Sequence, residues 1–435
     1  MNAPHTDAAV EPERHASAPA PAPSSARAND KSADTAAVTA AGAWREAAQR
    51  AAHVAARHAD HVDREARFPL EAFDALKSER LLSAMVPARF GGAGLSLAEV
   101  AGICETLAHG CASTAMIYAM HQIQVACIME HGAHLPWHQH VLAQLVEQQW
   151  LLASATSEEN IGGSMRTSAC AVEVNDGRFQ IEKMAPTISY GAHAEGILVT
   201  ARRTAESPAS DQVLIVTLLG DLELEKRGTW DSMGMRGTCS EGFRLLARGH
   251  AEQVLPTPFA EIADQTMLPV SHTLWAAVWT GIAADAVNRA QAFFRAQARA
   301  KPGSVPPAGM RLAEAVGLLQ MMQARLKVAL DAAHEAHQAH EARARHGADT
   351  PLSAQLHYAS DMNTLKTSIS STALLVVQEV LMICGMAGYK NGTEYSVGRH
   401  LRDLHSAPLM INNDRIAQNT ASLLLAQRPA SPGRA

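Results

Sequence analysis

The stretches Ile197-Leu198-Val199-Thr200 and Val213-Leu214-Ile215-Val216 decide the fold class of this chain. Both runs are short, rich in β-branched residues and free of charge, which is typical of buried strands. A shorter run, Val172-Glu173-Val174, precedes them and leads into the turn sequence Asn175-Asp176-Gly177. These features predict a compact β domain over residues 151–260.

The segments on either side of the β domain have helical patterns. Over residues 41–150, apolar residues such as Leu97, Val100 and Ile103 recur at helical spacing, and long helical segments return over residues 261–427. A helix–strand–helix order predicts an α+β fold, because an α/β fold would alternate strands and helices throughout. Residues 1–40 are dominated by Ala, Pro, Ser and charge, so we expect a disordered tail, and residues 428–435 form a second tail.

Composition restricts the class of protein. The chain has 435 residues and a formal net charge of -6, so we expect no broad basic surface for nucleic acid. The six cysteines are scattered without a C-x-x-C spacing, which indicates reduced thiols and a cytoplasmic protein. No apolar run approaches the ~20 residues that a membrane span needs, so none is expected. His334, His337 and His340 drift around a helix at their spacing of three, and we expect a solvated face and no metal site.

Four motifs follow one another along the chain. The first is a Pro/Gly-rich turn, the second a Gly-rich loop, the third a Trp-Asp segment and the fourth an Arg-Asp segment. They read Val86-Pro87-Ala88-Arg89-Phe90-Gly91-Gly92-Ala93-Gly94, Ser157-Glu158-Glu159-Asn160-Ile161-Gly162-Gly163-Ser164, Trp230-Asp231-Ser232-Met233-Gly234-Met235-Arg236-Gly237-Thr238-Cys239-Ser240 and Thr393-Glu394-Tyr395-Ser396-Val397-Gly398-Arg399-His400-Leu401-Arg402-Asp403. Together, in this order and with these gaps, they resemble the acyl-CoA dehydrogenase superfamily over roughly residues 45–427.

The resemblance implies a fold, a cofactor and an assembly. The fold would be an N-terminal helical domain, a central β-barrel-like domain and a C-terminal four-helix bundle. The cofactor would be FAD, whose reduced ring needs hydrogen-bond donors at its pyrimidine edge and at N5. The assembly would be a homodimer or homotetramer with the flavin at a subunit interface.

The resemblance also implies which residues bind the cofactor. Ser157 matches the flavin-facing hydroxyl of the first β segment, and Thr187-Ile188-Ser189 matches a second flavin-facing segment. Bare backbone and a hydroxyl in the Gly-rich loop would face the pyrophosphate. A C-terminal stretch would reach the adenosine half of a neighbouring subunit's FAD. The cofactor-binding positions are therefore expected at Ser157, Gly162, Gly163, Ser164, Ile188, Ser189, Gln378 and Gly385.

The chain departs from the family at the catalytic base. Members remove an α-proton with a Glu that follows the Arg-Asp motif, and the ungapped count places Ile411 there. The other position that members use for the base corresponds to Leu274. Neither side chain accepts a proton, and general-base catalysis contributes on the order of 10²–10⁴-fold. His121, Asp414 and His405 are weak candidates for a relocated base, and a packed core histidine is the favoured interpretation of His121.

Two reactions fit these observations. The first is dehydrogenation of the CH–CH group of an acyl thioester with a relocated or unidentified base, passing electrons to an acceptor. The second is flavin-dependent monooxygenation, which takes reduced flavin from a partner reductase and does not need the Glu. Trp275 to Ala283 has some likeness to the dibenzothiophene monooxygenase branch. The sequence favours the dehydrogenase, with the monooxygenase a close second.

Overall fold

The computed structural model describes residues 28–159, 165–303, 305–345 and 352–427. Contacts divide the chain after Ala43, and residues from Trp44 onward form one compact unit. Most of the predicted N-terminal tail and the whole of the C-terminal tail lie outside the described residues. The first helix begins at Ala28, inside the segment for which disorder was predicted.

The N-terminal part of the chain is helical. Helix α3 begins with a capping box, in which the Ser96 hydroxyl accepts from the Glu99 amide at 3.3 Å and the Glu99 carboxylate accepts from the Ser96 amide at 2.8 Å. The turn before it requires glycine at position 92, because a Cβ there would lie 2.0 Å from the Val86 carbonyl oxygen. The elements are α1 (Ala28–Glu65), α2 (Leu70–Ser78), the 3-10 helix η2 (Ala88–Phe90), α3 (Leu97–Gly110), α4 (Ala112–Gly132) and α5 (Pro136–Gln148).

The central β domain consists of two small sheets. One has the order β1-β4-β5, with β1 parallel to β4 and β4 antiparallel to β5, and the other has the antiparallel order β2-β3-β7-β6. The two runs that predicted this domain pair with each other, with Val199 opposite Ile215, and both are buried. The strands are β1 (Leu152–Ala155), β2 (Glu173–Asn175), β3 (Arg178–Ala185), β4 (Gly196–Arg202), β5 (Gln212–Leu218), β6 (Leu222–Lys226) and β7 (Phe243–His250).

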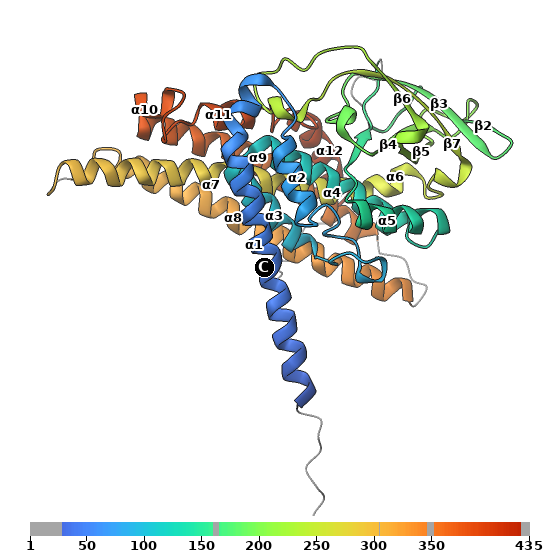
Figure 1. The fold of residues 1–435 in the computed structure, drawn as a ribbon, viewed down its shortest axis with the longest axis horizontal. Helices are drawn as coiled ribbons and strands as arrows, with labels where there is room; N and C mark the ends of the chain where they lie inside the picture. The colour runs from blue at the N-terminus through green and yellow to red at the C-terminus, as the bar shows by residue number, and fades with distance from the viewer. Residues whose placement is uncertain (1–27, 160–164, 304, 346–351, 428–435) are drawn as a thin grey trace, which may run out of the picture. The chain divides into compact units, whose positions relative to one another are not determined.

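The C-terminal part of the chain is a helical bundle. Helices α7, α8, α9 and α12 pack together, and α7 also packs on α3 and α4 of the N-terminal part. Figure 1 shows the long helices lying side by side, with the strands grouped apart from them. This arrangement confirms the predicted α+β fold class. The elements are α6 (Phe259–Ile262), the π-helix η7 (Ala263–Met267), α7 (Leu268–Ala300), α8 (Gly309–Arg345), α9 (Leu352–Cys384), α10 (Met386–Tyr389), α11 (Gly398–Leu404) and α12 (Asn413–Ala426).

One helix meets the length and apolarity of a membrane span, which the sequence analysis did not expect. It covers Ala354–Cys384 within α9, and 44% of its most apolar window is buried inside the protein. Because α9 packs against α7, α8 and α12, its apolar composition matches that of a central bundle helix.

Polar contacts of the short helix α11 join the three parts of the fold. Arg402 forms a two-pronged ion pair with Asp63 of α1, with one N–O distance of 2.9 Å, and this pairing raises the pKa of Arg402. The neighbouring Asp403 is buried and accepts from the Met235 amide at 2.6 Å. Burial raises the pKa of Asp403 to about 6, against the effect of that hydrogen bond. The third and fourth sequence motifs are therefore in direct contact.

This contact leaves no room for a side chain at Gly234. A Cβ at this position would lie 2.0 Å from the Arg402 carbonyl oxygen, which is backbone and cannot swing away. We expect Gly234→Ala to lower the free energy of unfolding by about 1–3 kcal/mol, the usual cost of overpacking. Urea unfolding followed by circular dichroism measures it. Gly220→Ala is the control, because a Cβ there meets nothing within 4 Å; equal midpoints for both variants would contradict the tight contact.

Candidate functional site

The two segments expected to face the cofactor lie side by side at the ends of β1 and β3. The Ser157 hydroxyl donates to the Thr187 carbonyl oxygen at 2.9 Å and lies 3.2 Å from the Thr187 hydroxyl. Ser157 and Ser189 are half-buried and Thr187 is exposed, while Ile188 between them is fully buried. The hydroxyl groups therefore lie at the protein surface, directly over the buried hydrophobic core.

A chain of hydroxyls holds Ser189 from behind. Its Oγ lies 2.8 Å from that of Ser240, which lies 2.8 Å from the Thr238 hydroxyl. The Thr238 hydroxyl donates to the Met235 carbonyl oxygen at 2.9 Å. Since Met235 also donates its amide to Asp403, the Ser189 segment is connected to the contact between the third and fourth motifs.

A buried ion pair anchors the residue that follows Ser157. The Lys183 ammonium lies 3.5 Å from the Glu158 carboxylate and donates to the Thr200 carbonyl oxygen at 2.7 Å. Glu158 also accepts from the Ser168 hydroxyl at 2.7 Å. Burial lowers the pKa of Lys183, and the Glu158 charge opposes this. Because Lys183 lies on β3 and bonds to Thr200 of β4, the pair holds the start of the Gly-rich loop to both strands. Removing one partner would leave an uncompensated buried charge.

Of the remaining predicted cofactor positions, the structure describes Gln378 and Gly385. Gly162, Gly163 and Ser164 lie outside the described residues. Gln378 is exposed on α9, and Gly385 is exposed at the N-terminus of α10, where its φ of 54° suits glycine. Both belong to the surface through which the resemblance predicts contact with a neighbouring subunit's cofactor, and this role stays a prediction.

Ile411 occupies the loop between α11 and α12. It is half-buried and has a φ of 49°, a left-handed conformation that costs roughly 1–2 kcal/mol for a side chain with a Cβ and is least favourable for β-branched residues. An apolar side chain in a strained backbone therefore stands where the resemblance places the catalytic base.

The weak candidates for a relocated base differ in how their side chains are placed. His121 is fully buried; its Nε2 donates to the Leu82 carbonyl oxygen at 2.7 Å and its Nδ1 accepts from the Leu152 amide at 3.0 Å. This leaves no ring nitrogen for a substrate. Asp414 and His405 are exposed. Leu274, at the alternative base position, is buried and apolar.

A buried cation that was not predicted from the sequence lies beneath the Ile411 loop. Lys366 of α9 is fully buried, and its ammonium donates to the Ile411 carbonyl oxygen at 2.8 Å and lies 5.7 Å from the centre of the Trp279 ring. Burial lowers the pKa of Lys366 to about 7, while the oxygen acceptors favour the charged form. One feature of the sequence could have indicated this buried cation: Lys366 is the one Lys, Arg, Asp or Glu between Asp361 and Glu379.

Aromatic and imidazole groups with unmet polar atoms continue along α7 from the Trp279 ring beside this cation. His272, Trp275 and Trp279 follow one face of α7, with successive ring centres 6.3 Å apart. Within the described part of the chain, their ring nitrogens lack partners with good hydrogen-bond geometry. Burial and the charge of Lys366 lower the pKa of His272 to about 3, although the Met362 backbone opposes this. The interior near Ile411 is therefore aromatic and holds neutral imidazole at physiological pH.

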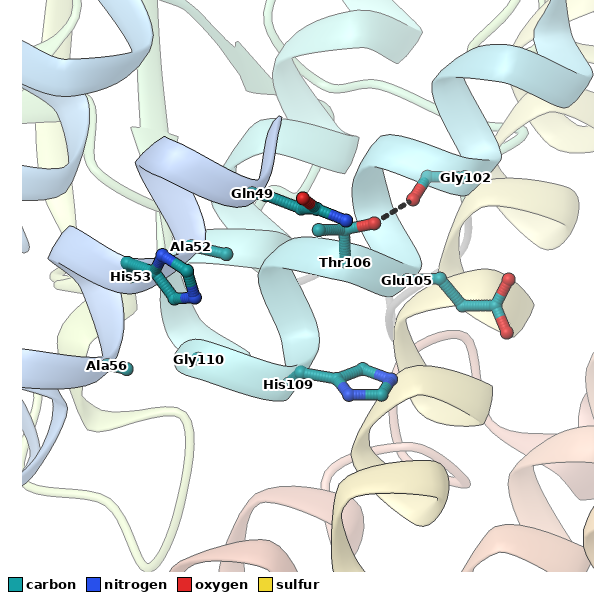
Figure 2. Close-up of a pocket in the computed structure, with 9 residues that line it drawn as sticks. All are labelled: Gln49, Ala52, His53, Ala56, Gly102, Glu105, Thr106, His109 and Gly110. Carbon is teal, nitrogen blue, oxygen red and sulfur yellow. Dashed lines mark hydrogen bonds between the residues drawn. The ribbon is translucent and has the colours of Figure 1, made fainter. Parts of the chain in front are cut away.

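An open pocket of about 620 Å³ lies elsewhere, between α1 and α3. Figure 2 shows Gln49 and His53 on α1 facing residues of α3, and the hydrogen bond of 2.8 Å from the Thr106 hydroxyl to the Gly102 carbonyl oxygen. Burial raises the pKa of Glu105 in its wall. None of the predicted cofactor positions that the structure describes lines this pocket, so it is separate from the hydroxyls of Ser157 and Ser189. Its lining is Gln49, Ala52, His53, Ala56, Gly102, Glu105, Thr106, His109 and Gly110.

Comparisons with known proteins agree with the sequence motifs. Residues 41–168 match the family described as acyl-CoA dehydrogenase, N-terminal domain. The chain is 26% identical to cyclohex-1-ene-1-carbonyl-CoA dehydrogenase of Geobacter metallireducens over 82% of its own length and 90% of that protein. It is 22% identical to dibenzothiophene monooxygenase of Rhodococcus erythropolis over 52% of its length and 55% of that protein. FMN-bound TdsC of Paenibacillus sp. A11-2 has the same fold, with a TM-score of 0.77 at 18% identity, covering 89% of this chain and 98% of that one.

The environment of His121 predicts a specific loss of stability in acid. Burial lowers the pKa of His121 to about 4, below its ordinary 6.5, so the folded protein holds it neutral. Its contribution is complete above pH 6.5 and is lost as the pH falls towards 4, because the unfolded chain binds the proton more readily. We expect His121→Gln to unfold at lower urea at neutral pH, by about 1–3 kcal/mol, and to show a flatter decline between pH 6.5 and 4.

The control for this prediction is His405→Gln, which alters an exposed histidine. Its urea midpoint should follow that of the wild type at every pH. A His121→Gln curve parallel to the wild-type curve would show that His121 already titrates normally in the folded protein.

Proposed function

The chain belongs to the acyl-CoA dehydrogenase superfamily, and on this premise we propose that it is a flavin-dependent oxidoreductase acting on a small molecule. The observation that carries the proposal is the group of hydroxyls of Ser157, Thr187 and Ser189, accessible in front and supported by buried polar contacts behind. The Thr187 and Ser189 hydroxyls, and the Ser157 hydroxyl once it turns away from the Thr187 carbonyl oxygen, would supply the hydrogen-bond donors that the polar edge of a flavin ring needs. We propose FAD, with Gly162, Gly163 and Ser164 at its pyrophosphate.

A bound flavin supplies hydride chemistry and, once reduced, the activation of dioxygen. This chain's own residues would orient the ring from the β domain and cover its substrate side with the Ile411 loop and the aromatic face of α7. The apolar Ile411 side chain excludes water and takes no proton. These residues support a reaction that does not depend on a carboxylate base.

Flavin-dependent monooxygenation is the reaction that the geometry supports best. Ile411 and Leu274 stand at both base positions of the family, His121 is fully engaged, and Asp414 is exposed. The sequence alone favoured dehydrogenation; we propose the opposite order, because neither base position of the family carries a carboxylate and both ring nitrogens of His121 are engaged. The proposal requires a partner reductase to supply reduced flavin, and a neutral small molecule as substrate.

Dehydrogenation of an acyl thioester is the second candidate. The likeness to cyclohex-1-ene-1-carbonyl-CoA dehydrogenase favours it, because it extends over most of both chains. It would require a base other than the groups described above and an electron acceptor to reoxidise the flavin. The two candidates therefore differ in the source of the flavin's electrons.

Assembly and location complete the proposal. We propose a homodimer or homotetramer, in which Gln378 and Gly385 reach a neighbouring subunit's FAD. Exposed apolar side chains near them, Met382 and Met386, favour coverage by another chain. All six cysteines are free and buried, which fits a reducing, cytoplasmic compartment.

Cofactor binding provides the first test. The full-length protein should bind FAD with one FAD per chain, measured by absorbance after desalting. Ser157→Ala should weaken binding about 5- to 10-fold, since it removes one hydrogen bond worth about 1 kcal/mol. Ser422→Ala, at an exposed position of α12, is the matched control. Protein that stays colourless after incubation with excess FAD would refute the proposed function.

The second test separates the two reactions. Anaerobic mixing with saturated acyl-CoAs of short to long chain should bleach the flavin slowly or not at all, because no base removes the α-proton. Ile411→Glu should raise the bleaching rate if its carboxylate reaches the substrate. Rapid bleaching of the wild-type protein would establish the dehydrogenase and overturn the monooxygenase. Supplying reduced flavin and dioxygen should give an oxygenated product from the monooxygenase alone.

A further inference from the structure

One buried ammonium holds the loop between α11 and α12 from below. The Lys366 Nζ lies 3.0 Å from the Ala407 carbonyl oxygen, 2.8 Å from the Ile411 carbonyl oxygen and 2.7 Å from the Asn413 Oδ1. Each of the three ammonium protons thus has an oxygen acceptor. The acceptors span the loop from its start to the first residue of α12, so a single side chain determines the path of the loop.

A second side chain of α9 reinforces this attachment. Ser370 lies one helical turn beyond Lys366, and its hydroxyl accepts from the Asn413 side-chain amide at 3.0 Å. Asn363, almost one turn before Lys366, donates to Asn419 of α12 at 2.9 Å. This face of α9 therefore carries a row of polar side chains directed at the loop and at α12, within a helix that is otherwise mostly apolar.

Packing alone does not account for a cation at this position. The Lys366 side chain is fully buried against Trp279, and no carboxylate forms an ion pair with it among the residues that the structure describes. A well-packed apolar side chain at such a position is often as stable as a buried charge or more so. What the ammonium adds is directed hydrogen bonding to two carbonyl groups and one amide, which fixes backbone positions that an apolar group would leave free.

The backbone conformation of Ile411 explains why hydrogen bonds from Lys366 are needed in this loop. Its φ of 49° is unfavourable for a β-branched residue and persists only where the surroundings impose it. The hydrogen bond from Lys366 to the Ile411 carbonyl oxygen acts directly on this residue. Without it, the loop would be free to relax to an extended backbone and to turn the Ile411 side chain elsewhere.

We propose that Lys366 is a positioning residue, which fixes residues 407–413 so that the Ile411 side chain covers the substrate side of the bound flavin and keeps water from it. The inference rests on the proposed function, because it gives the loop a role beside the flavin. Lys366 acts through the loop and does not itself touch the substrate.

Hydrogen–deuterium exchange of the full-length protein, with and without added FAD, tests the attachment. Lys366→Met keeps the length of the side chain and removes all three donors. Peptides covering residues 407–413 should exchange about 10-fold faster in this variant, because local opening requires fewer broken hydrogen bonds. Lys327→Met is the matched control, since Lys327 is exposed on α8. Unchanged exchange in Lys366→Met would overturn the proposal.

Reoxidation of bound FAD tests the role, with FAD and dioxygen as the probes. The protein is photoreduced, mixed with oxygenated buffer and followed by the absorbance of the oxidised flavin. We expect Lys366→Met to reoxidise about 10-fold faster than wild type, because a loosened loop admits dioxygen, which takes the two electrons of the reduced flavin and leaves as hydrogen peroxide, together with water. Its Kd for FAD should change less than about 2-fold, since the residues proposed to hold the flavin lie in the β domain.

Variants at Asn413 keep the test decisive if Lys366→Met fails to fold. Asn413→Ala removes one acceptor of Lys366 without altering the buried core, and it should shift exchange and reoxidation in the same direction by a smaller factor. Asn413→Asp retains the acceptor for Lys366 and loses the donor to Ser370, so its rates should lie between those of Asn413→Ala and the wild type. Faster exchange with unchanged reoxidation would show that Lys366 is only structural and would overturn its positioning role.

The wild-type titration separates the two proposals. Failure of the wild-type protein to bind FAD refutes the proposed function and, with it, the position of the loop beside a flavin. Wild-type binding, combined with a Lys366→Met variant that behaves like wild type in both measurements, refutes the inference about Lys366 and leaves the proposed function intact.

Discussion

The ion pair between Arg402 and Asp63, with the adjoining hydrogen bond from the Met235 amide to Asp403, is the interaction on which the rest of the structure depends. It connects α11 of the C-terminal bundle to α1 and to the β domain through two adjacent side chains. Because Gly234 lies against the Arg402 carbonyl oxygen, the backbones themselves are in contact and the geometry admits little adjustment. The orientation of α11, and so the start of the loop that carries Ile411, is determined here.

The same contact reaches the side of the β domain that we propose faces the cofactor. The Met235 carbonyl oxygen accepts a hydrogen bond from the Thr238 hydroxyl, and the chain of hydroxyls continues through Ser240 to Ser189. The residues proposed to hold the flavin and the loop proposed to cover its other side are therefore positioned by one connected set of polar contacts. Such an arrangement suits chemistry in which small displacements of the reacting groups are costly.

Several buried polar groups lower the stability of the fold relative to apolar residues packed at the same positions. The ion pair of Lys183 and Glu158 and the isolated ammonium of Lys366 both lie in surroundings where apolar residues would be more easily accommodated. In each case the polar group makes directed bonds to backbone atoms. Glu158, which follows Ser157, accepts from the Cys170 amide, and Lys366 donates to the Ile411 carbonyl oxygen. These groups give the site a definite shape at some expense of stability.

The sequence by itself determined the order of helices and strands, the two core strands around Ile197–Thr200 and Val213–Val216, and the four motifs; that these two strands pair with each other came from the structure. These follow from short-range periodicity and turn chemistry, which act between neighbouring residues. Through the family resemblance, it also predicted that Ser157 and Ser189 both face the cofactor. The tertiary structure alone decided that Lys366 bonds to Ile411, that His121 is fully engaged and that Asp63 meets Arg402. Those contacts join residues from 31 to 339 positions apart, and no local pattern specifies which buried polar groups will meet once the elements pack.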